Sequence, residues 1–248
     1  MGRADWIIER PVAHRGLHDS AMGVVENTAA AFRAAAAYGL ACECDLQISA
    51  DGEAMVFHDD TLDRLMDRTG RVDSLSAAEL RTIGMKSGRE RMIALGDLCD
   101  IAAGQMPIVI ELKASWSRDR RLEARVAAVL SAYRGQVAVM SFDPGSTAWF
   151  RANAPHLPRG VVQESMYDDP EWSGLTPMTK LALGHLLHLP SSRPDFLAWN
   201  VRDLMRRTPQ LARRLLGLPM LTWTVRTPAE QAKAALYADQ MIFEGFRP

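Results

Sequence analysis

The feature of this sequence that most restricts its fold is a regular alternation of short apolar, β-rich runs with longer stretches of helical period. Such alternation is typical of βα units that build a parallel sheet. The runs expected to form strands are Pro11–His14, Ala41–Leu46, Pro107–Leu112, Gln136–Ser141, Arg159–Gln163, Phe196–Val201, Met220–Val225 and Gln240–Glu244. A chain of 248 residues also has the typical size of one (β/α)8 barrel, about 250 residues. The sequence therefore predicts an α/β fold, a (β/α)8 TIM barrel.

Helical stretches lie between several of these runs. They are Thr28–Tyr38, Arg121–Tyr133, Pro144–Asn153, Asp203–Leu216 and Pro228–Tyr237. Gly39 follows the first of them directly, and a glycine at this position commonly ends a helix. The helical stretches support the barrel prediction because a parallel strand needs a crossover connection to the next strand.

One apolar run does not fit the parallel pattern. Ala54–His58 follows the second strand after the turn signal Asp51-Gly52, and so short a link allows only an antiparallel hairpin. A longer excursion with one capped helix, Ser76–Arg81, precedes the next barrel strand. We predict a single domain over residues 1–248, in which residues 46–105 form a hairpin and a small insertion above the barrel mouth.

Composition and charge exclude several classes of protein. Apolar residues make up 48% of the chain and charged residues 24%, as in an ordinary globular protein with a large core. The 29 basic and 30 acidic residues nearly cancel, so no global field attracts nucleic acid. No window approaches the roughly 18 apolar residues of a membrane span. We expect a soluble protein without a nucleic-acid partner or integral membrane association, and the sequence does not indicate its oligomeric state.

The cysteines indicate a reducing compartment. Cys42, Cys44 and Cys99 are too few, and odd in number, for a disulfide framework. The first ten residues have neither the basic nor the apolar region of a secretory signal. We therefore expect a cytoplasmic protein. Alternation along the strand places both thiols of Cys42-Glu43-Cys44 on the helix-packed face, which favours burial over soft-metal binding.

Carboxylates gather at the ends of two predicted strands. Glu43 and Asp45 share one face of their strand, and Glu111 shares a face with Lys113 at the end of another. Oxygen ligands of this kind suit a hard divalent cation, Mg²⁺ or Ca²⁺. A buried ion-pair network with Lys113 and Arg15 would explain these residues equally well if they stood alone.

Two histidines and a second cation end neighbouring segments. His14 and Arg15 end the first strand, and His58 ends the hairpin arm. The active sites of (β/α)8 barrels lie at the carboxyl ends of the strands, where all these groups are expected. Imidazole titrates near neutrality and therefore suits proton transfer. Two histidines beside an acidic cluster and two fixed cations indicate a catalytic site rather than packing.

The motifs follow one another along nearly the whole chain. They are His14-Arg15-Gly16, Glu26-Asn27-Thr28, Ala31-Phe32, Glu43-Cys44-Asp45, Asp51-Gly52, His58-Asp59, Leu62-Asp63-Arg64, Glu111-Leu112-Lys113, Ser141-Phe142 and Thr222-Trp223-Thr224-Val225. This ordered set resembles the glycerophosphodiester phosphodiesterase family. The resemblance implies a (β/α)8 barrel with a small insertion that binds one divalent cation and cleaves glycerophosphodiesters to glycerol 3-phosphate and an alcohol.

The resemblance also implies roles for individual residues. They are an acid–base pair of His14 and His58, phosphate contacts from Arg15 and Lys113, a metal site of Glu43, Asp45 and Glu111, and an aromatic wall for glycerol from Trp223. The chain departs from the family pattern at Val25, Leu65–Arg68, Arg226 and Glu244. Because none of these is a predicted site residue, we expect them to change only the substrate's outer contacts.

Several alternatives stay open at this level. The apolar stretch Trp172–Leu189 is compatible with a phospholipase that acts on lysophospholipids or phosphoinositides. A non-catalytic barrel that binds phosphorylated ligands would be expected to lack a histidine or a carboxylate, and all are present here. The sequence does not show which histidine is the acid, or whether water or the substrate's 2-hydroxyl attacks phosphorus.

Overall fold

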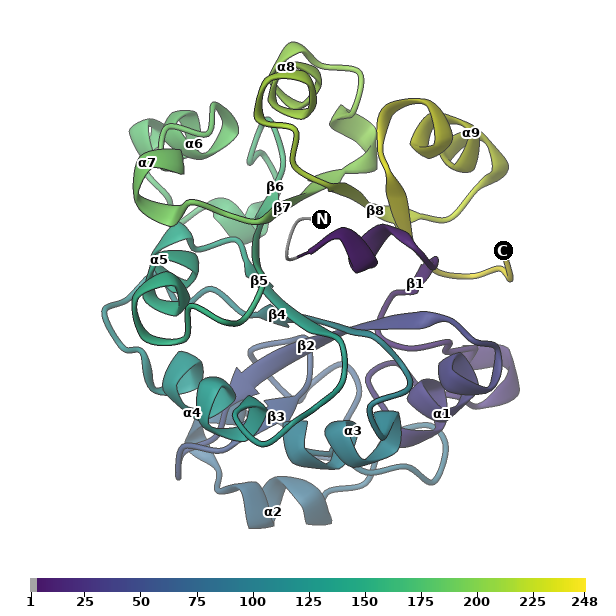
Figure 1. Cartoon of the computed structure of the whole chain (residues 1–248). Coiled ribbons are helices and arrows are strands. Elements are labelled where there is room, and N and C mark those ends of the chain that lie inside the picture. Colours follow the sequence, from purple (N-terminus) through teal and green to yellow (C-terminus); the bar gives the residue numbers. More distant parts are fainter. Residues whose placement is uncertain (1–3) are drawn as a thin grey trace.

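The computed structural model describes residues 4–248, and within them eight parallel strands close into a barrel (Figure 1). They are β1 (Val12–Ala13), β2 (Ala41–Ile48), β4 (Ile108–Leu112), β5 (Val137–Ser141), β6 (Arg159–Gln163), β7 (Phe196–Asn200), β8 (Met220–Val225) and β9 (Gln240–Phe243). Each strand pairs with the next, and β1 pairs with both β2 and β9. The predicted (β/α)8 barrel is confirmed.

Helices cover the outside of the barrel (Figure 1). They are α1 (Ala29–Ala37), α3 (Leu95–Ala102), α4 (Arg121–Leu130), α5 (Pro144–Asn153), α6 (Pro177–Gly184), α7 (Leu189–Ser192), α8 (Arg207–Leu216) and α9 (Pro228–Tyr237). The short 3-10 helices η2 (Ser20–Met22), η3 (Val72–Ser74), η4 (Pro170–Trp172) and η5 (Val201–Asp203) stand in the connections between these elements. Local chemistry sets several ends. Thr28 and Thr227 cap α1 and α9 through their hydroxyls, and Gly217 ends α8 in the left-handed conformation.

Strand alternation divides the apolar side chains into two layers. Val12, Ala41 and Val109 belong to a cluster that fills the barrel interior. Cys42 and Cys44 belong instead to the cluster between strands and helices, and both are fully buried. Their predicted burial on the helix-packed face is therefore confirmed.

The hairpin after the second strand forms as predicted. β3 (Ala54–Val56) pairs antiparallel with β2, with Val56 opposite Leu46. The following segment has an apolar cluster of its own and the helix α2 (Ala77–Thr82), whose capping box joins Ser76 and Glu79. The excursion therefore packs as a small unit rather than as a loose loop.

The same excursion contains a helix that sequence reasoning missed. α3 packs against α1 and α4 and contributes Leu95 and Leu98 to the layer between strands and helices. It lacks a side-chain N-cap, and only Asp97 accepts a hydrogen bond from the Ala94 N–H, at 2.8 Å. Residues 95–102 thus belong to the helical ring of the barrel.

The segment before β1 lies across the barrel opening (Figure 1). It forms the 3-10 helix η1 (Asp5–Ile8), and Ala4 and Ile7 pack with the interior side chains Val12 and Ile242. The carboxyl ends of the strands are left for polar side chains. Within residues 4–248, no helix has the length and apolarity needed to cross a bilayer.

Candidate active site

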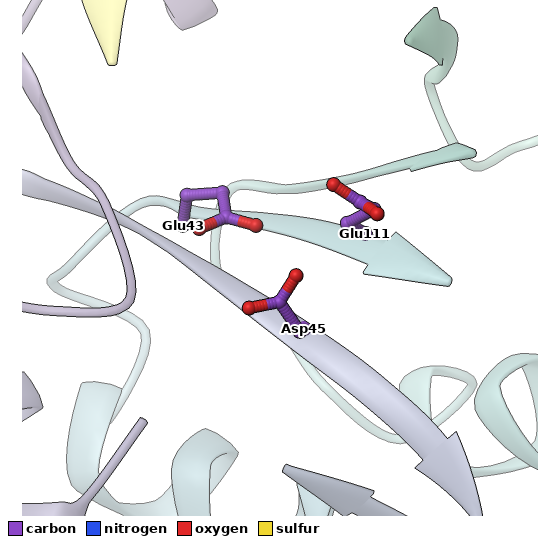
Figure 2. A group of neighbouring side chains, drawn as sticks. All are labelled: Glu43, Asp45 and Glu111. Atoms are coloured by element: carbon purple, nitrogen blue, oxygen red, sulfur yellow. The ribbon is translucent and has the colours of Figure 1, made fainter. Parts of the chain in front are cut away.

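Three carboxylates converge at the carboxyl ends of two neighbouring strands (Figure 2). Glu43 and Asp45 project from β2 and Glu111 from β4, with Asp45 directly opposite Glu111 in the strand register. Each offers an oxygen within 4.8 Å of the others, and none of the three residues is more than 8% exposed. This carboxylate triad is the cluster that alternation predicted.

Two cations border the carboxylate triad. Lys113 Nζ lies 2.6 Å from Asp45 Oδ1 and 2.7 Å from Glu111 Oε1. Arg15 Nε lies 3.2 Å from Asp45 Oδ2, and the Arg15 backbone N–H donates to Glu43 Oε2 at 3.0 Å. Burial lowers the pKa of Lys113, but Asp45 and Glu111 outweigh it and hold that pKa well above its usual value.

The carboxylate triad still lacks a partner for one oxygen. Glu43 Oε1 is buried without a hydrogen-bond partner among the described residues. Burial, and then repulsion from Asp45 and Glu111, raises the pKa of Glu43 well above its usual value. Burial also acts on Asp45, but Lys113, His58 and Arg15 hold its pKa well below the usual value. Three carboxylates against two fixed cations, with one acceptor oxygen unused, fit a bound divalent cation.

Asn27 fixes the orientation of the central carboxylate. Its side-chain amide donates to Asp45 Oδ2 at 2.9 Å and accepts from the Asp45 backbone N–H at 3.3 Å. Asn27 itself is 1% exposed and has a positive φ of 56°, a conformation that asparagine tolerates better than most residues. The residue directly before the α1 cap thus serves the site.

His14 contacts a carboxylate that directly follows the last strand of the barrel. Its Nδ1 lies 2.5 Å from Glu244 Oε2, and Glu244 Oε1 in turn accepts from Arg226 Nε at 2.5 Å. Burial lowers the pKa of His14 to about 4, although the bond to Glu244 opposes this. The expectation that Glu244 and Arg226 affect only outer contacts is wrong, because Glu244, the residue directly after β9, bonds His14.

His58, like His14, has its Nδ1 against a carboxylate. Its Nδ1 lies 2.7 Å from Asp59 Oδ1, and its side chain is 30% exposed. Arg64 bonds both Asp59 and Glu26, and Glu26 accepts from Arg15 at 2.6 Å. Each histidine therefore has Nδ1 fixed by a carboxylate, which leaves Nε2 to exchange protons.

A cavity of about 550 Å³ opens beside the carboxylate triad. Glu111, Lys113, His58 and Phe142 line it. Trp223 packs against Phe142, with ring centroids 5.4 Å apart, and its indole N–H donates to the Ala198 carbonyl at 3.1 Å. Six of the eight predicted site residues contact one another or line this cavity: Arg15, Glu43, Asp45, His58, Glu111 and Lys113. His14 directly precedes Arg15 in the sequence, and Trp223 contacts Phe142, which lines the cavity.

The matching family model bears the description "Glycerophosphoryl diester phosphodiesterase family" and covers residues 14–243. The chain belongs to this family. The resemblance that the sequence motifs suggested is thus confirmed.

Individual relatives agree with the family match. A glycerophosphodiester phosphodiesterase of Caldanaerobacter subterraneus is 29% identical over 163 residues, which cover 62% of this chain and 66% of the relative. Glycerophosphodiester phosphodiesterase 1 of Bos taurus is 45% identical over 74 residues, or 29% of this chain and 21% of the relative. The chain thus matches less than two thirds of the length of these relatives.

Solved structures share the fold. A phosphodiesterase of Oleispira antarctica, in complex with its product sn-glycerol-3-phosphate, superposes with a TM-score of 0.78 at 21% identity, over 97% of this chain and 94% of the other. A glycerophosphodiester phosphodiesterase of Thermotoga maritima has a TM-score of 0.69 at 21% identity, over 95% and 94%. At these identities the likeness concerns the barrel.

A second acidic group at the barrel mouth was not predicted from the sequence. Glu164, Asp168 and Asp169 form this outer acidic group, and all three share Arg202 Nη2, at 3.3, 3.2 and 3.1 Å. Glu164 also accepts from Asn200 Nδ2 at 3.4 Å. Glu164 directly follows β6, and its place at a strand end was the one signal that could have indicated it.

Proposed function

We propose that this member of the glycerophosphoryl diester phosphodiesterase family hydrolyses glycerophosphodiesters to glycerol 3-phosphate and an alcohol. The observation that carries the proposal is the buried carboxylate triad beside the cavity, with Glu43 Oε1 unpartnered. The glycerol 3-phosphate in the Oleispira antarctica enzyme supports the choice of product. Glu43, Asp45 and Glu111 would hold one divalent cation, Mg²⁺ or Ca²⁺.

A divalent cation in such a site polarises a phosphoryl oxygen and lowers the pKa of a bound hydroxyl. The residues of the chain supply the remaining requirements. Lys113 and Arg15 offer positive charge to the phosphate, Arg15 as a planar fork and Lys113 as a point charge. Both already lie against the carboxylate triad, so the phosphate would meet them without a rearrangement of the strands.

Two histidines would handle the protons. One takes the proton of the nucleophile and the other protonates the leaving alcohol, each through its Nε2. His58 lines the cavity, whereas His14 is buried and bonded to Glu244. The nucleophile is water or the glycerol 2-hydroxyl, and cleavage of a 2-deoxy analogue at an undiminished rate would exclude the hydroxyl route.

A second candidate substrate class is favoured by one surface feature. Met178 and Leu187, in the stretch that follows η4, are 80% and 66% exposed and offer an apolar surface to a lipid chain. A phosphodiesterase that acts on lysophospholipids would use such a surface. Lysophosphatidylcholine tested beside glycerophosphocholine separates the two classes by their relative kcat/KM.

The cytoplasmic location is also proposed. The cysteines Cys42, Cys44 and Cys99 are free thiols, as expected in a reducing compartment. Cell fractionation followed by detection of the native protein tests this proposal, and recovery from an oxidising compartment would contradict it.

The decisive assay uses a panel of glycerophosphodiesters with choline, ethanolamine, glycerol and inositol as the leaving alcohol. We expect release of glycerol 3-phosphate, loss of activity in excess chelator, and recovery when Mg²⁺ or Ca²⁺ is added back. Heat-denatured protein serves as the control. Full activity in excess chelator would refute the metal site, and no cleavage of any member of the panel would refute the function.

A further inference from the structure

Aromatic side chains form one part of the cavity that extends from the carboxylate triad. Trp116, Trp172 and Phe142 all line it. The rings of Trp116 and Trp172 meet at 86° with centroids 6.3 Å apart, and Phe142 packs on Trp172 with centroids 4.7 Å apart. Trp172 is 5% exposed, whereas Trp116 is 37% exposed. The two indoles are nearly perpendicular, Phe142 packs against Trp172, and the exposed aromatic surface in the cavity comes mainly from Trp116.

The same cavity is strongly acidic. Seven carboxylates line it, those of Asp59, Asp60, Asp73, Glu111, Asp119, Glu123 and Glu171, against the two fixed cations Arg71 and Lys113. Six of the seven form ion pairs with arginine or lysine. Among the described residues, Glu171 has no hydrogen bond or ion pair. The negative potential of the cavity therefore includes one carboxylate that has no cation of its own.

Glu171 lies next to the aromatic side chains of the cavity and within electrostatic range of the carboxylate triad. It directly precedes Trp172 in η4, and its residue is exposed at the cavity surface. Partial burial of its carboxyl raises the pKa of Glu171, although the charges of Lys113 and His58 oppose this. Trp116, Trp172 and the Glu171 carboxylate thus line the same cavity as Lys113 and His58, which are proposed to act on the phosphodiester.

The residues that line the cavity indicate that it holds the leaving alcohol. Trp223, expected on the glycerol side, packs against Phe142 and is not among the residues that line the cavity. His58, a candidate to protonate the leaving alcohol, does line it. A phosphate bound at Lys113 would therefore direct its alcohol toward Trp116 and Glu171.

We propose that Trp116, Trp172 and Glu171 bind a quaternary ammonium group on the leaving alcohol, so that the chain prefers choline-type glycerophosphodiesters. This proposal rests on the proposed diesterase function. A quaternary ammonium donates no N–H hydrogen bond, and it is held by aromatic faces, best by tryptophan, and by an unshared negative charge. The primary ammonium of ethanolamine is compact and strongly hydrated, so it gains less from aromatic faces than a quaternary ammonium does.

The first test compares two esters of the same shape. Glycerophosphocholine and glycerophospho-3,3-dimethylbutanol differ only in a quaternary nitrogen replaced by carbon. We expect wild-type kcat/KM to favour the choline ester about tenfold, and Glu171→Gln and Trp116→Leu to reduce this ratio about three- to tenfold each. Trp116→Phe should keep most of it. Glu9→Gln, the same charge change at an exposed residue after η1, is the matched control.

The second test measures binding without turnover. Choline should change the tryptophan fluorescence of the wild-type protein saturably, 3,3-dimethylbutanol should do so far more weakly, and the choline signal should weaken in Glu171→Gln. Equal kcat/KM for the two wild-type esters would overturn the ammonium pocket and leave the diesterase intact. Choline-selective binding without hydrolysis of either ester would support the pocket and overturn the diesterase function.

Discussion

The carboxylate triad and the outer acidic group contain the same number of carboxylates at the same barrel mouth, but they have different surroundings. The triad is buried, is bordered by two separate cations, and keeps one oxygen without a partner. In the outer acidic group one arginine, Arg202, bonds all three carboxylates, and Asp168 and Asp169 are 62% and 47% exposed. Glu164 Oε1 of the outer acidic group is likewise buried without a partner among the described residues, so the unused oxygen does not separate the two groups. What separates them is that all three carboxylates of the triad are buried, whereas only Glu164 is buried in the outer acidic group.

The largest expected effect comes from removing a carboxylate of the triad. Glu43→Gln should lower kcat/KM by about 10³ to 10⁴, because a catalytic cation contributes several kcal/mol to transition-state stabilisation. The matched variant Asp169→Asn, in the outer acidic group, should stay within about threefold of wild type. Steady-state kinetics on glycerophosphocholine measure both. A comparable loss in both variants would erase the distinction between the two groups.

Histidine replacement extends the comparison to the side chains around each group. His58→Ala should lower kcat by at least about 10²-fold, the lower end of what a general acid or base contributes. His188, which bonds Gln163 near the outer acidic group, provides the control His188→Gln. Rates are compared at one pH and saturating metal. A wild-type rate in both His58→Ala and His14→Ala would contradict the proposed acid–base pair.

Metal binding should also stabilise the fold through the triad alone. At a free metal concentration of about 100 Kd, ligation of the native state adds about 2.7 kcal/mol to the free energy of unfolding. Denaturant unfolding with and without Mg²⁺ or Ca²⁺ should show this gain in wild type and in Asp169→Asn, but not in Glu43→Gln. Equal gains in all three proteins would place the cation elsewhere.

The smallest effect concerns Glu164 and pH. Burial raises the pKa of Glu164 to about 7, from a usual value near 4.5. The folded state therefore binds its proton more tightly than the unfolded state, and this contribution to stability is lost as pH rises from about 4.5 to 7. Between pH 5 and 8, wild type should lose about 2 kcal/mol more than Glu164→Gln. Parallel curves for the two proteins would show that Glu164 is not the group responsible, and Glu9→Gln controls for the lost charge.

The fold was predictable because local signals agree with it. The bounds predicted for β6, β8, α5 and α9 are those observed, since each has a clear apolar run or a capped start. α3 was missed because its start has no capping side chain and its sequence lies in a segment that reads as loop. Propensity alone does not report the packing against α1 and α4 that stabilises it.

The sequence predicted which residues converge at the site, but it did not predict their individual contacts. Alternation and strand ends placed Glu43, Asp45 and Glu111 together. No local pattern relates His14 to Glu244, which lie 230 positions apart and meet only when the barrel closes. The ion-paired state of Arg15 likewise depends on Glu26 in a neighbouring loop.

Arg64 bonds Glu26 before α1 and Asp59 beside His58, so the excursion after β3 is tied to the first βα loop by a shared guanidinium. For protein engineering this makes the two loops one module. A chimaera that imports the excursion of a relative, in order to change headgroup preference, must keep an arginine at the position of Arg64. Without it, Glu26 would keep Arg15 alone, and the imported His58 equivalent would lose the arginine that holds its carboxylate.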